Sequence, residues 1–371
     1  MNNYQTVVEL LKRGQGILKL RPEFVHRFYP DLNRLGQQRL KRSSRQFIPE
    51  RWIGSTVAAV NPPPMPSGGL SMVDVPRSVP PLSLRDAIKA APLELLGQDI
   101  LDAHGPEFRV LVKILDPGEP IVFHLHATDA QVARMKQNFR GHRFGKDEAY
   151  YFLEAPKGPQ PYTHAGLWEG VTHAQVVRAI ERGREYALEL SPSFYQTIGE
   201  GFFVPAGVPH RPGTALTLEI QQPSDVYTLL ELYSAGKLMP PAQRHPGFRT
   251  LEQAMKLIDV NVAQRVGRLD GFRLKPVPVQ RKHSGGQVAT IFPVEVCRKF
   301  AGRRIHVSSR LSYSESLPFV LLIWRGRGTV NGRSFRAGDE FFVSHDAAAH
   351  GIELHNSGDE LVEAFTFLPA V

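Results

Sequence analysis

Two kinds of short stretch recur along this chain, apolar runs and segments in which apolar and polar side chains alternate. Both patterns predict β-strands. The stretches are residues 108–116, 148–153, 202–204 and 215–222 in the first part of the chain, and 317–324, 328–333, 340–343 and 361–368 in the last part. Asn331 and Gly332 give the turn signal of a hairpin in the second group. The pattern therefore predicts a mainly β protein with two sets of strands.

A few segments between these stretches have the spacing of helices. Residues 3–13 fit a short amphipathic helix. Thr172 and Gln175 have capping-box spacing and open a helix that ends near residue 190. We therefore expect a helical segment at the N-terminus and a helical insert over about residues 165–195.

Composition places the chain among ordinary globular proteins. Its 371 residues, 42% hydrophobic and 22% charged, are enough for two hydrophobic cores. The single cysteine, Cys297, excludes an internal disulfide, and the first residues lack the charged and apolar segments of a signal peptide. No run approaches the roughly 18 apolar residues that a membrane span needs. We therefore expect a cytoplasmic protein without a membrane-spanning segment.

The charge balance bears on possible ligands. The chain has 45 Lys and Arg against 36 Asp and Glu, a net charge of +9. This excess is compatible with an anionic small molecule such as a sugar phosphate. A basic cluster at residues 39–45 could also suggest nucleic acid, but no aromatic residues are interleaved with the charges as in known nucleic-acid modules. A solvated or phosphate-facing surface is the preferred interpretation.

Four side chains have the types and positions of metal ligands. His124 and His126 are two apart in an extended stretch, so their side chains point the same way. Glu148 opens an apolar strand, and His210 follows a turn in which Gly207 permits a left-handed backbone. Imidazole and carboxylate groups converging from different strands can bind a divalent metal. The sequence therefore predicts one metal site on these four residues.

The spacing of these residues resembles the two motifs of the cupin superfamily. Residues 118–148 match Gly-x5-His-x-His followed by Glu, and residues 199–210 match Gly-x5-Pro-x-Gly-x2-His. Thr214 stands where the second motif usually closes with Asn. Longer segments are similar in order and gaps to type I phosphomannose isomerase, over about residues 50–235. These segments are residues 113–116, 122–129, 145–151, 205–210 and 218–225.

The resemblance implies two cupin, jelly-roll-like barrels, of which only the first binds metal. Residues 51–245 would form the metal-binding barrel with its helical insert, and residues 246–371 a second, degenerate barrel without a His-x-His pair. We expect residues 1–50 to be a basic helical extension.

The resemblance also implies a metal and its ligands. In the family the metal is usually zinc, held by a Gln-x-His pair, a glutamate and a histidine. His124 stands where the family has glutamine, while His126, Glu148 and His210 match directly. Three histidines and one glutamate suit zinc, and also iron, manganese or nickel.

Catalytic residues follow from the same comparison. Lys146 matches the family's active-site lysine, and Glu219 and Asp225 match acidic positions after the last ligand. Glu219 is the expected base, because strand alternation points it into the barrel. The family's catalytic arginine is missing, since Leu229 stands at the corresponding position. We take Arg211, directly after the last ligand, as a candidate replacement.

The function implied is a metal-dependent aldose–ketose isomerase that resembles mannose-6-phosphate isomerase. A base would move a proton between C1 and C2 of a sugar, which we expect to be phosphorylated, through an enediolate. Two alternatives stay open. Three histidines and one glutamate can also hold Fe(II) in a cupin oxygenase, and the barrel could bind sugar without turnover.

Overall fold

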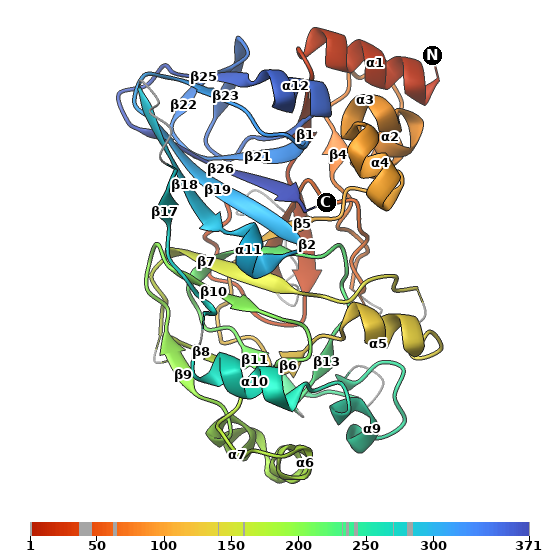
Figure 1. Cartoon of the computed structure of the whole chain (residues 1–371), viewed down its shortest axis with the longest axis vertical. Coiled ribbons are helices and arrows are strands. Elements are labelled where there is room, and N and C mark those ends of the chain that lie inside the picture. Colours follow the sequence, from red (N-terminus) through yellow and green to blue (C-terminus); the bar gives the residue numbers. More distant parts are fainter. Residues whose placement is uncertain are drawn as a thin grey trace.

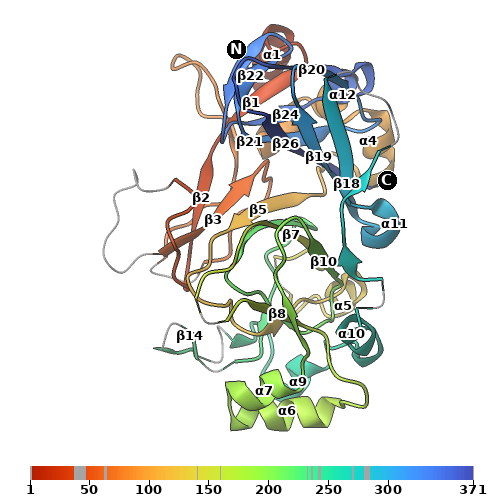
Figure 2. The ribbon, with the colours of Figure 1, turned by 90° about the vertical axis from the view of Figure 1, so that its left-hand side faces the viewer.

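The chain folds into two β-rich halves stacked along the long axis of the molecule (Figures 1 and 2). The computed structural model describes residues 2–36, 47–61, 65–139, 141–158, 160–231, 233–234, 237–240, 244–269, 271–279 and 285–370. The basic cluster at residues 39–45 lies outside the described residues. Each half consists of one large and one small antiparallel sheet, which confirms the predicted mainly β fold with two cupin barrels.

The first half contains the metal-ligand motifs. Its large sheet has, in spatial order, β16 (Arg273–Leu274), β10 (Gly201–Val204), β7 (Glu148–Glu154), β12 (Leu216–Gln221), β5 (Leu111–Leu115), β3 (Phe47–Ile53) and β2 (Glu23–Arg27). Its small sheet has β13 (Thr228–Leu229), β6 (His124–Leu125), β11 (His210–Arg211), β8 (Tyr162–Ala165) and β9 (Ser193–Tyr195). The two sheets enclose the candidate site.

The second half repeats this arrangement. Its large sheet has β17 (Val277–Pro278), β18 (Gly286–Phe292), β19 (Phe300–Val307), β26 (Val362–Pro369), β21 (Phe319–Arg325), β24 (Glu340–Val343), β1 (Ile17–Arg21) and β4 (Met72–Val73). Its small sheet has β20 (Arg310–Tyr313), β25 (Ile352–Asn356), β22 (Arg327–Val330) and β23 (Arg333–Arg336). The hairpin predicted at Asn331 joins β22 to β23, where its φ is 46°. A separate pair, β14 (Tyr233–Ser234) and β15 (Lys237–Leu238), lies outside these sheets.

The two halves share one hydrophobic core. Buried side chains of both large sheets belong to a single cluster, so the sheets pack against each other. The rings of Phe108 and Phe342 lie 5.2 Å apart, and those of Tyr151 and Phe365 lie 5.8 Å apart. Such edge-to-face contacts between buried aromatic rings stabilise the interface beyond the area they bury.

Helices cover the two ends of the molecule. Near the second half lie α1 (Asn3–Arg13), α2 (Leu84–Ala90), α3 (Pro92–Leu96), α4 (Gln98–His104), α11 (Val294–Cys297) and α12 (His345–His350) (Figure 1). Near the first half lie α5 (Asp129–Arg134), α6 (His173–Arg182), α7 (Arg184–Glu189), α9 (Leu251–Met255) and α10 (Val260–Gly267). The N-terminal helix and the helical insert were both predicted, and Thr172 caps α6 with Gln175 in a capping box.

Two expected region boundaries differ from the structure. Residues 1–50 are not a helical extension, because β1 pairs with β24 of the second half and β2 pairs with β3 of the first. These short strands were missed because their partners lie far away in the chain. Residues 246–274 were assigned to the second barrel, yet α10 packs beside β8 and β16 pairs with β10 of the first.

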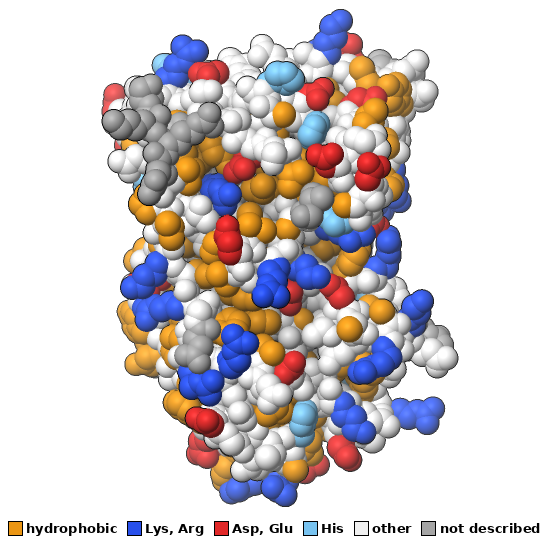
Figure 3. All heavy atoms as spheres, in the orientation of Figure 1, with side chains coloured by type: hydrophobic (Ala, Val, Ile, Leu, Met, Phe, Trp, Pro, Cys, Tyr) orange, Lys and Arg blue, Asp and Glu red, His pale blue; other side chains and the backbone are white. Residues whose placement is uncertain are grey.

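The surface of the described chain is mixed in character. Lys and Arg side chains are spread over the face in Figure 3 between acidic and apolar ones. In the part of the chain that the structure describes, no helix has the length and apolar character that crossing a membrane requires.

Candidate metal centre

The four predicted metal ligands lie together inside the first half. His124 on β6 pairs directly with His210 on β11, and Glu148 is the first residue of β7 in the opposite sheet. His126 follows β6, two residues after His124. One potential ligand atom from each of the four residues lies within 4.8 Å of the others, and all four residues are buried. His124 and His126 thus point the same way, as strand alternation predicted, and Glu148 and His210 lie next to them.

Backbone hydrogen bonds fix the orientation of the three imidazoles. Each ring donates its Nδ1–H to a carbonyl oxygen: His124 to Val122 at 2.6 Å, His126 to Val226 at 2.7 Å, and His210 to Val208 at 2.9 Å. A neutral imidazole with its proton on Nδ1 has a lone pair on Nε2. Such bonds from the outer ring nitrogen are the usual support of a metal-ligating histidine.

A cation between these groups would satisfy them. The Nε2 atom of His210 lies 2.9 Å from Oε1 of Glu148 and has no hydrogen-bond partner among the described residues. Nε2 of His126 lies 3.1 Å from Oε2 of the same carboxylate. A neutral imidazole lone pair and a carboxylate are both acceptors, so their proximity in a buried site requires a proton or a cation. Three imidazoles and one carboxylate fit a divalent transition metal.

The electrostatics favour the metal-binding forms of these side chains. Burial, with the neighbouring His210 and His126, holds the pKa of His124 well below its ordinary value. Burial, with the Lys146 ammonium, lowers the pKa of His126 to about 3. Burial alone would raise the pKa of Glu148, but Lys146 and the two neighbouring histidines outweigh it and hold that pKa well below its ordinary value. The two histidines are thus neutral and the carboxylate is ionised near neutral pH.

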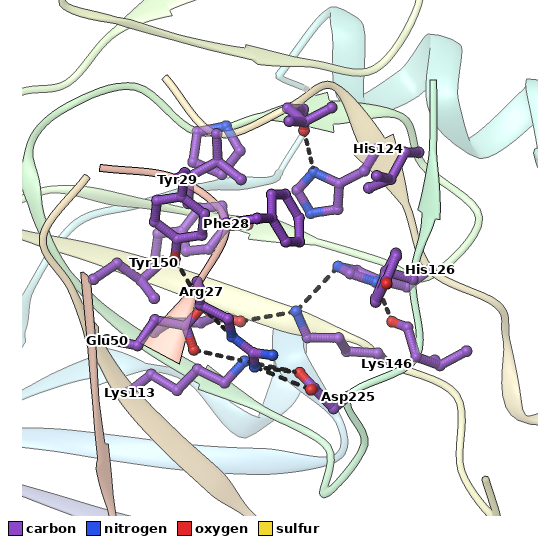
Figure 4. A pocket seen from close by; sticks show the side chains of 18 residues that line it. Arg27, Phe28, Tyr29, Glu50, Lys113, His124, His126, Lys146, Tyr150 and Asp225 are labelled. Carbon is purple, nitrogen blue, oxygen red and sulfur yellow. Dashed lines mark hydrogen bonds and ion pairs between the residues drawn. The ribbon is translucent and has the colours of Figure 1, made fainter. Parts of the chain in front are cut away.

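A lysine and a second glutamate lie beside the ligands. Nζ of Lys146 is 2.5 Å from Oε2 of Glu148, 3.0 Å from Oε1 of Glu219 and 3.1 Å from Nε2 of His126. Figure 4 shows the Lys146 side chain reaching toward His126. Burial raises the pKa of Glu219 to about 7, against the opposing effect of Lys146. The structure thus brings both of these predicted residues to the ligand cluster.

A buried charge network forms the back of the cavity, and most of it was not predicted. Arg27 on β2 lies between two carboxylates (Figure 4), with Nε 3.0 Å from Glu50 and Nη2 2.8 Å from Asp225. Nζ of Lys113 lies 3.6 Å from Asp225 and 3.8 Å from Glu50. The indole N–H of Trp52 donates to Glu50 at 2.6 Å. Burial alone would raise the pKa of Glu50, but Arg27 and Lys113 outweigh it and lower that pKa to about 2.

Signals for this network were weak in the sequence. Asp225 and Lys113 lie in segments that carry the family resemblance, but Arg27 lies outside them. Val25 and Arg27 alternate with His26 on β2, and both are buried. A charged residue in such a position is normally assigned to solvent, and only the carboxylates of distant residues explain its burial.

Arg211 is not brought to the cavity. On β11 it follows His210, so its side chain leaves the opposite face of the strand. Its guanidinium lies 3.1 Å from Glu231 and 3.1 Å from Gln160. The same Glu231 also binds Arg184 at 2.6 Å. Arg211 therefore belongs to an ion-pair network outside the cavity, and alternation from His210 could have indicated this.

A cavity that opens to solvent lies in front of the ligands. About 580 Å³ of empty space lies within its walls, including the part that is open to solvent. Its polar wall carries His124, His126, Lys146 and Glu219. Apolar and aromatic side chains form the rest of the lining, namely Phe28, Leu115, Ile121, Val122, Pro212, Tyr227 and Leu229 among others.

Comparison with known proteins identifies the fold. No family model matches the sequence, and no curated protein matches it in sequence. The mannose 6-phosphate isomerase from Bacillus subtilis is similar in structure, with a TM-score of 0.67 at 18% identity, covering 95% of this chain and 99% of that chain. A single-residue variant of the phosphomannose isomerase from Salmonella typhimurium gives a TM-score of 0.67 at 14% identity, covering 96% of this chain and 100% of that chain. The fold is that of the phosphomannose isomerases, as the sequence resemblance implied.

Proposed function

We propose that this chain is a metal-dependent isomerase that interconverts an aldose and a ketose. The observation that carries this proposal is the placement of an acid–base pair beside the four ligand groups. Lys146 contacts both the ligand Glu148 and Glu219, so a substrate in the cavity would meet the ligand cluster and Glu219 together. That combination suits proton transfer next to a carbonyl group.

Each residue has a role in this reaction. A divalent metal held by His124, His126, Glu148 and His210 would supply Lewis-acid polarisation of the sugar oxygens. Glu219 would take the proton from C2 of the aldose and return it to C1, while the proton of the O2 hydroxyl moves to O1, so that the product is the neutral ketose. Lys146 would donate a hydrogen bond to a substrate oxygen and balance the charge that develops on it.

The charge network would hold the far end of the substrate. Lys113 lies more than 3.5 Å from either carboxylate and packs over the Trp52 ring, with Nζ 4.8 Å from the ring centre. Its ammonium can therefore donate to a substrate hydroxyl or phosphate oxygen. The N–H groups of Arg27 already bond to Glu50, Asp225 and Asn61. Its role would therefore be to hold the carboxylates of Glu50 and Asp225 in place.

The neighbours in structure provide the first substrate to test. They are isomerases of mannose 6-phosphate, and we extend that substrate to this chain as part of the proposal. Purified protein, loaded separately with zinc, manganese, nickel and iron, would be assayed for interconversion of mannose 6-phosphate and fructose 6-phosphate, with mannose and fructose in parallel. Turnover of either pair supports the proposal. Iron-dependent oxygen uptake without isomerisation of any aldose would instead indicate an oxygenase.

A further inference from the structure

A second and larger cleft lies on another face of the Asp225 segment. Its walls are residues 56–60 after β3, helix α2, the loop 104–108 after α4, and the loop 141–144 before β7. In Figure 1 helices α2 and α4 lie above α5 on the same side of the molecule. The cleft encloses about 1820 Å³ of empty space including its open mouth, compared with about 580 Å³ for the metal cavity. It is large enough for an organic ligand.

Hydrogen bonds hold the walls of this cleft in place. The backbone N–H of Val60 donates to Asp225 at 2.8 Å, which fixes the segment after β3. The hydroxyl of Ser224 donates to the carbonyl oxygen of Phe144 at 3.0 Å, which fixes the loop before β7. The cleft is therefore formed before any ligand binds.

One wall presents two cations that have no acidic partner among the residues that the structure describes. Arg85 and Lys89 lie four residues apart on α2, so they share a helix face, and both line the cleft. Nε of Arg85 is buried without a hydrogen-bond partner in the described part of the chain. Lys89 is exposed. Among the described residues, neither side chain forms an ion pair.

The acidic side chains of the lining are already neutralised. Glu107 forms an ion pair with Arg143, and Asp225 is bound by Arg27 at 2.8 Å. The positive charge of Arg85 and Lys89 is therefore in excess, and an anion entering the cleft would gain their attraction.

The floor of the cleft is apolar. Val57, Ala59, Ile88 and Phe108 contribute to the lining, as does the ring of Phe144. The guanidinium of Arg143 lies 5.4 Å from the centre of that ring. A ligand with only hydrophilic groups would leave these apolar side chains in contact with water. A ligand with an apolar part would cover them and gain the free energy of burying apolar surface.

From these features we propose that the cleft binds a small phosphorylated molecule whose remaining part is apolar. Arg85 and Lys89 would bind the phosphate, because a guanidinium fork and an ammonium both donate several hydrogen bonds to phosphate oxygens. The apolar part would lie against Ile88 and Phe108. The site is separate from the proposed isomerase reaction and requires no metal.

Isothermal titration calorimetry with phenyl phosphate tests this directly. We expect saturable binding to the full chain, weakened roughly tenfold or more in Arg85→Ala/Lys89→Ala because charge-assisted hydrogen bonds are lost. Lys89→Glu alone changes an exposed residue, so it keeps the fold intact and should also weaken binding. Inorganic phosphate, which lacks the apolar part, should bind more weakly than phenyl phosphate.

A matched control comes from α6 at the other end of the molecule. Arg178 and Arg182 are exposed and, like Arg85 and Lys89, four residues apart, so Arg178→Ala/Arg182→Ala removes the same charge at the same spacing. We expect phenyl phosphate to bind this variant as it binds the unaltered protein. Equal weakening in both double variants, unchanged binding in Lys89→Glu, or absence of saturable binding would each overturn the proposal, as would equal affinity for inorganic phosphate.

Discussion

At the scale of single residues, the chemistry of the candidate metal centre depends on the orientation of its histidine and glutamate side chains. The three Nδ1 bonds to backbone carbonyls turn the lone pairs of His124, His126 and His210 inward. Glu148 faces them, and the Lys146 ammonium contacts both Glu148 and Glu219. The proposed function assigns metal binding to Glu148 and proton transfer to Glu219, and variants can separate the two roles.

The change Glu219→Gln tests this division. The amide keeps the shape of the side chain but cannot accept a proton, so we expect the rate constant kcat for isomerisation to fall by at least about 100-fold. The metal content, measured by mass spectrometry, should stay that of the unaltered protein. Exchange of the substrate C2 proton with deuterated solvent should be lost in parallel. Full activity in this variant would show that Glu219 is not the base.

Arg27 gives a prediction about stability. Arg27→Met leaves Glu50 and Asp225 buried without their main cation, which costs about 3–5 kcal/mol of unfolding free energy. Urea unfolding followed by circular dichroism measures this change. The double variant Arg27→Met/Asp225→Asn should lose less than the sum of the two single variants, because the pair interacts directly at 2.8 Å. Additive losses would contradict the assigned contact.

At the scale of elements, the ligands come from strands and a turn that the sequence largely revealed. Two histidines two apart, a glutamate at the start of an apolar strand and a Gly–Pro turn identified the four residues that cluster in the first half, because strand alternation is local information. Strands β1 and β2 were missed, since their place depends on partners far away in the chain. Arg27 shows the same limit, because its carboxylate partners lie 23 and 198 positions away.

The turn before His210 can be tested by substitution. Gly207 has φ +84°, and an added Cβ would lie 3.3 Å from Asp259. Gly207→Ala should cost about 1–2 kcal/mol through backbone strain and shift His210, so that zinc affinity falls as well. Calorimetric zinc titration and thermal unfolding measure the two effects.

A loop glycine of the same backbone conformation serves as the control for that variant. Gly170 has φ +80° and no atom within 4 Å of an added Cβ. Gly170→Ala should lose similar stability while zinc affinity stays unchanged. Equal loss of zinc affinity in both variants would show that the turn does not position His210.

At the scale of the whole molecule, the two halves are joined by packed sheets and one buried ion pair. Nη2 of Arg51, on β3 of the first half, lies 3.2 Å from Glu340, on β24 of the second. The same guanidinium donates to the carbonyl oxygen of Gly338 at 2.6 Å. The second half thus supports the first through β3, which also carries Glu50 of the cavity network.

This pair makes the stability of the molecule depend on pH. Burial raises the pKa of Glu340 from 4.5 to about 7, against the opposing effect of Arg51. The folded state therefore holds this proton more tightly than the unfolded state. The contribution is fully present below about pH 4.5 and is lost as pH rises through about 7, by at most about 3 kcal/mol.

Unfolding free energies at pH 5 and pH 8 measure this effect. Glu340→Gln should reduce the loss of stability between these pH values, while Glu360→Gln, which alters an exposed glutamate of the same half, should leave it as in the unaltered protein. An unchanged pH dependence in Glu340→Gln would rule out Glu340 as its source.

The measurement that bears most directly on the central claim is the zinc stoichiometry of the metal-depleted protein, determined by calorimetric titration. Three imidazoles and one carboxylate meeting in the first half predict one tightly bound ion per chain, with binding lost or greatly weakened in His210→Ala. The absence of binding to the unaltered protein, or equal affinity in His210→Ala, would contradict the account.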